Sequence, residues 1–203
     1  MISLPMKLGF LASGNGSSAR AIVAAITTGG LAAGPRRMVS NKRDAPALEF
    51  ARTDGFAAIC IPTKADPEGA DARLCAEMSA HGVDLIVMSG YLRQLGPQIL
   101  DLYAGRIINI HPGLLPQFGG HGMYGRRVHE AVIAAGVAQS GAVIHVVDAE
   151  YDEGPELARM TVPVLPGDTP ADLEARVTSS EPGFFVETLK RIASGDLALP
   201  NGG

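Results

Sequence analysis

The feature that most constrains the fold of this chain is an alternation of short apolar runs with longer helical patterns over its first 110 residues. The apolar runs fit buried strands at residues 7–13, 37–40, 57–61, 84–88 and 106–110. Helical patterns lie between them at residues 19–28, 45–53, 70–81 and 97–103. Because helices are the usual crossovers between parallel strands, the pattern predicts an α/β fold with an open, mostly parallel, twisted sheet and helices on both faces.

The second part of the chain begins with a Pro/Gly-rich loop at residues 111–125, which is long for a compact domain and indicates a functional role. A helix at residues 126–135, strands at 142–147 and 158–164, and a helix at 170–194 interrupted at Glu181-Pro182 are expected after it. With 203 residues and 46% hydrophobic content, the chain is expected to form one domain over residues 1–203.

Charge and cysteine usage exclude several classes of function. The formal net charge is −4, and no basic run offers a grip on a nucleic-acid backbone, so nucleic acid is not expected as a partner. No apolar stretch approaches the ~20 residues of a membrane span, and the N-terminal apolar stretch is too short for a signal peptide. Cys60 and Cys75 make a poor disulfide framework, which favours a reducing compartment and a cytoplasmic location.

The turn Gly14-Asn15-Gly16-Ser17-Ser18 lies between the first predicted strand and the first predicted helix. Backbone N–H groups and the helix dipole make an anion site at such a position, so the turn is a candidate phosphate cradle. The alternative is a tight turn with a serine N-cap. A dinucleotide or nucleoside triphosphate site is disfavoured, because Ala19 stands at the third glycine position and no Gly-Lys-Ser/Thr follows.

Asn109 and His111 are two residues apart at the carboxyl end of a predicted strand, so their side chains face the same way. Ligands of open α/β sheets bind at that edge. An amide N–H and an imidazole are what acyl transfer needs to stabilise an oxyanion and to hold a proton. Asp152 lies in an acidic loop after the strand that contains His145, where it is either a catalytic carboxylate or part of a solvated turn.

Histidines without a catalytic assignment are expected to be structural. His145 fits a satisfied core histidine. His111, His121, His129 and His145 also lack a ligand spacing such as His-Glu-x-x-His, so no metal is expected.

Six stretches make the chain resemble the glycinamide ribonucleotide formyltransferase family, the folate-dependent enzymes of purine biosynthesis, over nearly its whole length. They are Ser13-Gly-Asn-Gly-Ser17, Val39-Ser-Asn-Lys42 with Asp44-Ala45, Gly90-Tyr-Leu-Arg-Gln-Leu95, Asn109-Ile-His-Pro112 with Leu114-Leu-Pro116, Gly141–His145, and Asp152-x-Gly-Pro155. The resemblance implies a Rossmann-like formyltransferase fold. It also implies transfer of the formyl group of 10-formyltetrahydrofolate, as co-substrate, to the amine of 5′-phosphoribosylglycinamide.

The resemblance further assigns site residues. The family's catalytic trio falls on Asn109, His111 and Asp152, its phosphate loop on Gly16, Ser17 and Ser18, and the glutamate that holds the ribonucleotide on Glu181. The folate site falls on Leu92, Arg93, Gln94 and Leu95, and on the closing loop Asp148, Ala149, Glu150, Tyr151 and Asp152. Residues 1–105 are then the phosphate-binding half and residues 106–203 the folate-binding and catalytic half. The expected partners are small-molecule substrates only, in a monomer or homodimer.

Several positions depart from the family pattern. Ser18 replaces a common Asn, Gln117 replaces a frequent Lys, and residues 65–69 offer no arginine for the folate tail. Glu156 and Arg159 stand where an aliphatic residue and a Gln are usual, and the loop at residues 121–125 is longer than in many relatives.

Three alternatives remain open from the sequence. Hydrolysis of the same formyl-folate uses a similar trio, but those relatives carry a further domain ahead of the first strand. Sugar-amine and methionyl-tRNA formyltransferases normally require an additional C-terminal domain, for which 203 residues leave no room. A non-catalytic folate- or nucleotide-binding module would make the convergence of the three polar residues a coincidence.

Overall fold

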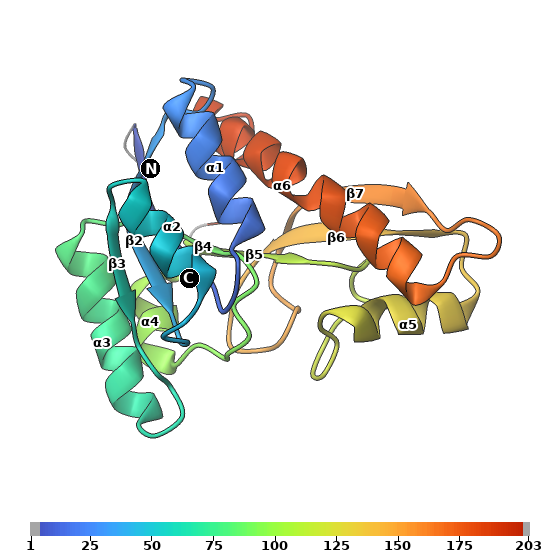
Figure 1. The fold of residues 1–203 in the computed structure, drawn as a ribbon, viewed down its shortest axis with the longest axis horizontal. Coiled ribbons are helices and arrows are strands. Elements are labelled where there is room, and N and C mark those ends of the chain that lie inside the picture. The colour runs from blue at the N-terminus through green and yellow to red at the C-terminus, as the bar shows by residue number, and fades with distance from the viewer. Residues whose placement is uncertain (1–4, 201–203) are drawn as a thin grey trace.

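Seven strands form one sheet in the computed structural model of the chain, which describes residues 5–200. The strands are β1 (Met6–Leu11), β2 (Ala33–Ser40), β3 (Ala57–Cys60), β4 (Leu85–Met88), β5 (Ile107–His111), β6 (Gln139–Val146) and β7 (Glu156–Pro163). Their order is β3-β2-β1-β4-β5-β6-β7. The strands from β3 to β5 pair in parallel, whereas β6 and β7 each pair antiparallel with the strand before them. The predicted open, mostly parallel sheet is confirmed (Figure 1).

Helices cover both faces of this sheet. They are α1 (Ser17–Thr27), α2 (Pro46–Thr53), α3 (Pro67–Ala80), α4 (Pro97–Leu102), α5 (Arg126–Ala135) and α6 (Pro170–Ser194). Buried residues of α1, α2, α5 and α6 belong to the larger apolar cluster, and those of α3 and α4 to the smaller one. Ile108 and Ile110 of β5 join the larger cluster and Ile107 the smaller, as the alternation of side chains along a strand requires.

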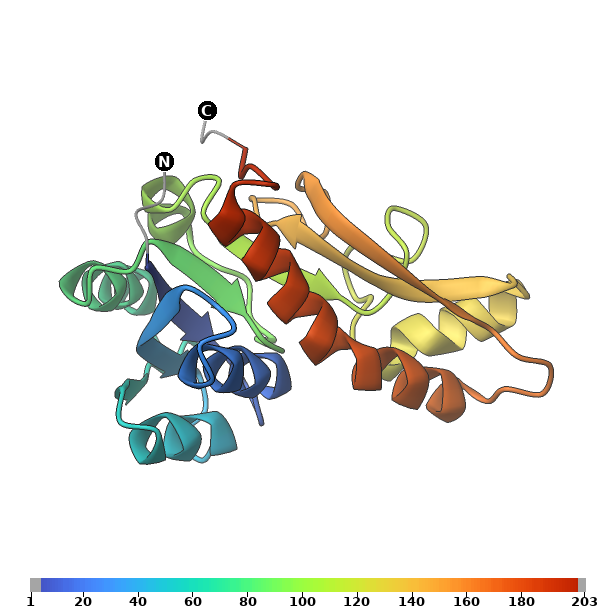
Figure 2. The same ribbon diagram turned by 90° about the horizontal axis from the view of Figure 1, so that it is seen from above.

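The expected interruption of the last helix is absent, because α6 runs without a break through Pro182. A proline inside a helix costs about 3 kcal/mol. Buried side chains on both sides of it offset that cost, namely Leu173, Val177, Phe185 and Leu189. The helix crosses much of the molecule and contacts α1, α5, β6 and β7 (Figure 2). Within residues 5–200, none of the helices combines the length and apolar character that spanning a membrane requires.

The strand order gathers the carboxyl ends of several strands at one edge of the sheet, where a ligand can bind. The chain winds from β1 outward to β3 and then returns to β4 on the other side of β1, so the carboxyl ends of β1 and β4 flank a topological switch point. β5 lies next to β4 and ends at the same edge with His111. The antiparallel strand β6 then brings His145 opposite Asn109. Residues far apart in the sequence therefore meet at this edge.

Candidate active site

A cleft of about 810 Å³ opens at the carboxyl edge of the parallel strands. Every residue that the sequence singled out for catalysis, phosphate or folate lines it: Gly14, Asn15, Gly16, Ser17, Ser18, Leu92, Arg93, Gln94, Leu95, Asn109, His111, Asp148, Ala149, Glu150, Tyr151, Asp152 and Glu181. Lys42 and Arg127, to which the sequence assigned no role, add two cationic side chains to the lining. One cavity thus holds the candidate phosphate site, the candidate site for the folate ring, and the trio Asn109, His111 and Asp152.

His111 and Asp152 lie in direct contact in this cleft. Nδ1 of His111 is 3.3 Å from Oδ2 of Asp152, and Nε2 is 2.7 Å from the carbonyl oxygen of Phe118. Both neighbours are acceptors, so an imidazolium, which donates from both nitrogens, would satisfy both. Because the Nδ1 contact is longer than the 2.7–2.9 Å usual for a charge-assisted bond, Nδ1 is the nitrogen that can turn to a ligand oxygen.

Burial lowers the pKa of His111 below its ordinary 6.5, although the charge of Asp152 and the Phe118 carbonyl act to raise it. The imidazole is therefore mostly neutral at pH 7 in the ligand-free protein. This differs from the expectation that it holds a proton near neutral pH, because desolvation opposes the charged form. A negative oxygen that forms beside Nδ1 would favour the imidazolium, so protonation of His111 is coupled to the presence of that charge.

Asp152 is held by its backbone conformation and by a hydrogen bond from the loop that follows β5. Its φ of 60° lies in the left-handed region, which Asp tolerates better than most residues. Oδ2 accepts a hydrogen bond from the Gly120 N–H at 3.0 Å. Burial acts to raise the pKa of Asp152, but the contact with His145, the charge of His111 and the Gly120 N–H together lower it. The side chain is therefore an ionised carboxylate at neutral pH.

His145 joins the trio, although the sequence indicated only a core histidine. It is buried on β6, as expected, but its Nε2 lies 3.3 Å from Nδ2 of Asn109 and 3.5 Å from Oδ1 of Asp152. Its Nδ1 faces the carbonyl of Val146 at 3.0 Å. Nε2 therefore lies between the two side chains: protonated, it donates to the Asp152 carboxylate, and unprotonated, it accepts from the Asn109 amide. The sequence did not reveal the contact of His145 with Asn109, because that contact depends on the antiparallel pairing of β5 and β6.

The turn after β1 has a glycine and not a serine at the N-cap of α1, so the alternative of a serine cap is wrong and the turn remains a candidate anion cradle. Gly16 is the N-cap of α1, with a φ of 65°, and has no side chain to cap the helix, while the N–H of Ala19 donates to Ser89 Oγ at 3.3 Å. Ser13 Oγ donates to Asn41 Oδ1 at 2.6 Å and accepts from the Leu92 N–H at 2.9 Å. The phosphate candidate is therefore tied directly to the folate candidate. Because the N-cap is a glycine and Ser89 serves only the Ala19 N–H, the N–H groups of Ser17 and Ser18 are left for a ligand anion.

Glu181 is a partly buried carboxyl group in the lining of the cleft. Burial raises its pKa from 4.5 to about 7, and no neighbouring charge or hydrogen bond contributes to that shift. A carboxylate is an acceptor for two hydroxyl groups, so sugar hydroxyls are matched ligands for this position. Without a ligand, the group is a destabilising element of the fold at neutral pH.

This shift predicts that Glu181→Gln flattens the pH dependence of stability. The folded-state pKa is raised, so the parent's stability is fully present below the unfolded pKa of 4.5 and falls as the pH rises through about 7. We expect the free energy of unfolding to fall by about 2 kcal/mol less in the variant between about pH 5 and pH 8, a value reduced for partial exposure. Denaturant titrations of both proteins at the two pH values measure the free energy of unfolding. An equal change in that free energy between the two pH values for parent and variant would contradict the prediction.

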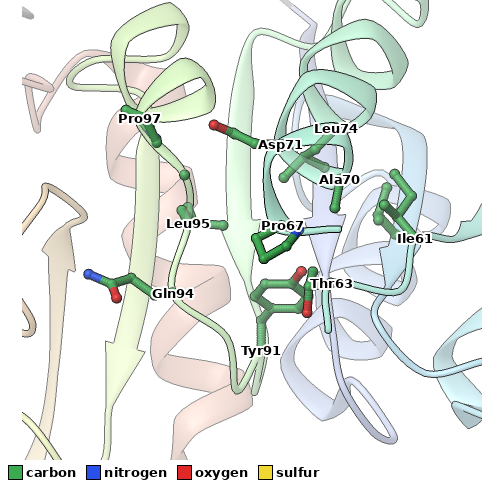
Figure 3. A pocket seen from close by; sticks show the side chains of 12 residues that line it. Ile61, Thr63, Pro67, Ala70, Asp71, Leu74, Tyr91, Gln94, Leu95 and Pro97 are labelled. Atoms are coloured by element: carbon green, nitrogen blue, oxygen red, sulfur yellow. The ribbon is translucent and has the colours of Figure 1, made fainter. Parts of the chain in front are cut away.

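A second, smaller cavity of about 350 Å³ lies between α3 and the segment before α4. Figure 3 shows the Tyr91 ring beside Thr63 and Pro67 at this cavity. Burial raises the pKa of Tyr91 to about 12, so its hydroxyl keeps its proton. The Asp71 carboxylate is occupied, since it accepts from the backbone N–H groups of Gln98 and Ile99 at 2.9 and 3.1 Å. Reactive groups therefore gather in the larger cleft and not here.

The structure locates one of the departures from the family pattern, Gln117, and bears on the question of a metal site. Gln117 is exposed and does not line the cleft, so a lysine missing there leaves the lining unchanged. Within residues 5–200, no three His, Cys, Asp or Glu side chains are grouped so as to hold a metal ion.

A sheet with helices on both faces and a polar trio at its edge is the arrangement of an enzyme class, and the sequence comparisons identify that class. The formyl transferase family model matches residues 6–189, and the chain belongs to this family. The relatives that are named for an activity point to one member of the class. Phosphoribosylglycinamide formyltransferase of Escherichia coli is 35% identical over 196 residues, covering 96% of this chain and 90% of the relative.

Two further relatives agree. The chloroplastic phosphoribosylglycinamide formyltransferase of Arabidopsis thaliana is 38% identical over 190 residues, which are 92% of this chain. The chain spans only 65% of the length of that relative. The crystal structure of glycinamide ribonucleotide transformylase 1 from Symbiobacterium toebii superposes with a TM-score of 0.88 at 34% identity and covers 97% of this chain and 92% of its own. The predicted family and fold are both confirmed.

Proposed function

We propose that this protein transfers the formyl group of 10-formyltetrahydrofolate to the amine of 5′-phosphoribosylglycinamide, a step of de novo purine biosynthesis. The observation that carries the proposal is the convergence of Asn109, His111, His145 and Asp152 between an anion cradle and a ring site in one cleft. The names of the relatives support the same substrates.

The cleft fits the two substrates by its chemistry. At the Gly14–Ser18 turn, backbone N–H groups and the α1 dipole suit a phosphate, and Glu181 suits the ribose hydroxyls. Leu92 and Tyr151 are 57% and 42% exposed in the lining, which is unusual for large apolar side chains and offers faces for a flat folate ring. The folate would lie between the Leu92–Leu95 segment and the Asp148–Asp152 loop.

In the proposed reaction, the neutral substrate amine attacks the formyl carbon and gives a tetrahedral intermediate with a negative oxygen. The Asn109 amide donates to that oxygen, and Nδ1 of His111 also donates to it once the imidazole has taken up a proton from solvent, which the growing negative charge favours. His145 holds the Asn109 amide in place through the 3.3 Å contact. As the folate nitrogen leaves, the attacking nitrogen loses a proton and the leaving nitrogen gains one, and Asp152 relays it through water.

In this proposal, residues 1–203 act as one cytoplasmic domain, as a monomer or homodimer, on small-molecule substrates alone. The first 105 residues supply the anion cradle and the segment Leu92–Leu95, and the later residues supply the trio, the folate loop and Glu181. The folate is a co-substrate, and no step requires a metal, because the nucleophile is an amine and the acyl donor is already activated.

An absorbance assay of folate deformylation tests the function. We expect rapid loss of the formyl group when 10-formyltetrahydrofolate and phosphoribosylglycinamide are both present, and only slow loss with water alone. Equal rates with and without the amine substrate would indicate the hydrolase instead. Binding of both compounds without turnover would indicate a non-catalytic module.

A further inference from the structure

Arg159 and Glu156 of β7 depart from the family pattern, and the structure gives them a shared role. Arg159 donates from Nε and Nη2 to the two carboxylate oxygens of Glu156, at 3.0 and 2.5 Å. The Nη2 group also donates to the carbonyl oxygen of Leu115 at 2.9 Å. The guanidinium therefore fastens a strand of the sheet to the loop between β5 and α5. A bidentate carboxylate contact holds the guanidinium in a fixed orientation.

Strand register places Arg159 in line with the catalytic histidine. His111 of β5 pairs with Val143 of β6, and Val143 pairs with Arg159 of β7. Directly opposed residues of antiparallel strands project from the same face of a sheet. Arg159 therefore stands on the face of the sheet that carries His111, two strands away, and the loop after His111 runs back toward it.

The loop that Arg159 holds makes two contacts with the reacting groups. The Phe118 carbonyl accepts from His111 Nε2 at 2.7 Å, and the Gly120 N–H donates to Asp152 Oδ2 at 3.0 Å. Between them, Gly119 packs closely against Leu115 and Asp152, since a Cβ there would lie 2.3 Å from Leu115 Cδ2 and 3.1 Å from Asp152 Cβ. A displacement of Leu115 would therefore act on the segment that makes both contacts.

We propose that Arg159 is a positioning residue, which fixes the Leu115 carbonyl and thereby holds the loop contacts that orient His111 and Asp152. Its effect on turnover rests on the proposed function, whereas its effect on the histidine does not. The Leu115 and Phe118 side chains are buried and anchor the same loop by packing. Arg159 adds the directional contact that packing alone lacks, at the carbonyl oxygen of Leu115.

The charged and titratable groups that face His111 define the readout. They are Asp152, His145 of β6 and His129 of α5. None of them contacts Arg159, so a change in the His111 titration after substitution of Arg159 reports on the loop. Because the Phe118 carbonyl favours the protonated imidazole, loss of that contact shifts the pKa of His111 further down.

The test compares Arg159→Met with the parent. We expect a downward shift of the His111 titration, followed by NMR of the imidazole carbons, and a fall of about tenfold in kcat with nearly unchanged KM for both substrates. Arg159→Lys keeps a long side chain with a donor for the Leu115 carbonyl, so we expect it to restore both values to within about twofold of the parent. A lysine variant that behaves like the methionine variant would overturn the proposal.

Arg176→Met is the matched control. Arg176 makes the same kind of contact elsewhere, since it pairs with Asp168 and donates to the Pro163 carbonyl at 2.8 Å. We expect this variant to lower thermal stability without moving the His111 titration. Equal shifts in the Arg159→Met and Arg176→Met proteins would refute a specific role for Arg159. A parent protein without formyl transfer would refute the proposed function alone, because the imidazole titration needs no turnover.

Discussion

Replacing Asp152 with asparagine is expected to reduce kcat by about 10²–10⁴-fold, the usual contribution of a positioned proton-transfer group. The amide cannot relay a proton at neutral pH, and it removes the negative charge beside His111 and His145. Asparagine tolerates the left-handed backbone at this position, and its side-chain oxygen can still accept from the Gly120 N–H. The fold and the binding of both substrates should therefore survive, which steady-state kinetics and equilibrium binding of the folate would establish.

Glu153→Gln is the control for this experiment. Glu153 is the next residue of the same loop, is exposed and does not line the cleft, so the substitution removes the same charge without touching the site. We expect near-parental kcat from it. If Asp152→Asn retained comparable activity, the carboxylate would have no part in proton transfer.

Replacing His111 with alanine is expected to reduce kcat by about 10²–10³-fold, the cost of one oxyanion donor. The variant should also lose about 1–3 kcal/mol of stability, because the buried Phe118 carbonyl loses the partner that lies 2.7 Å away. Thermal unfolding separates this loss from the kinetic one. The measurement is kcat at saturating concentrations of both substrates, at a temperature where the variant is fully folded.

His81→Ala is the comparison for this second variant. His81 caps the end of α3, and its ring contacts the Glu77 carbonyl at 2.8 Å, so it shares a backbone contact but not the cleft. Turnover should be unaffected by its loss. A His111→Ala protein with more than about a tenth of parental kcat would exclude the imidazole from oxyanion stabilisation.

Much of this fold could be predicted because its signals are local. The apolar runs at residues 84–88 and 106–110 are too short for helices and are bounded by turns, and β4 and β5 lie there within one or two residues. The beginning of β2 was missed: the strand starts at Ala33, because Gly34 and Pro35 lack the apolar pattern of a buried strand although they pair with β1. The uninterrupted α6 was missed because its support comes from packing on both sides of Pro182.

The candidate site was predictable where polar residues follow strand ends, and less so where antiparallel pairing decides. Asn109 and His111 stand at the end of a recognisable strand, so their place at the sheet edge follows from sequence. The contact of His145 with Asn109 depends on the register of β5 and β6, which sequence does not fix. Contacts made by the long loop, such as Phe118 with His111, are likewise invisible before the tertiary fold is known.

The left-handed backbone at Asp152 also limits which single-nucleotide mutations of its codon the fold tolerates. Single-nucleotide changes from aspartate lead to asparagine, glycine, alanine, valine, glutamate, histidine or tyrosine, and of these asparagine and glycine accept the conformation most readily. The others add a backbone cost of about 1–2 kcal/mol. Mutations at this codon would therefore fall into two groups. Asparagine and glycine would give abundant protein that binds its substrates without converting them, whereas the other residues would give unstable protein that cellular quality control removes.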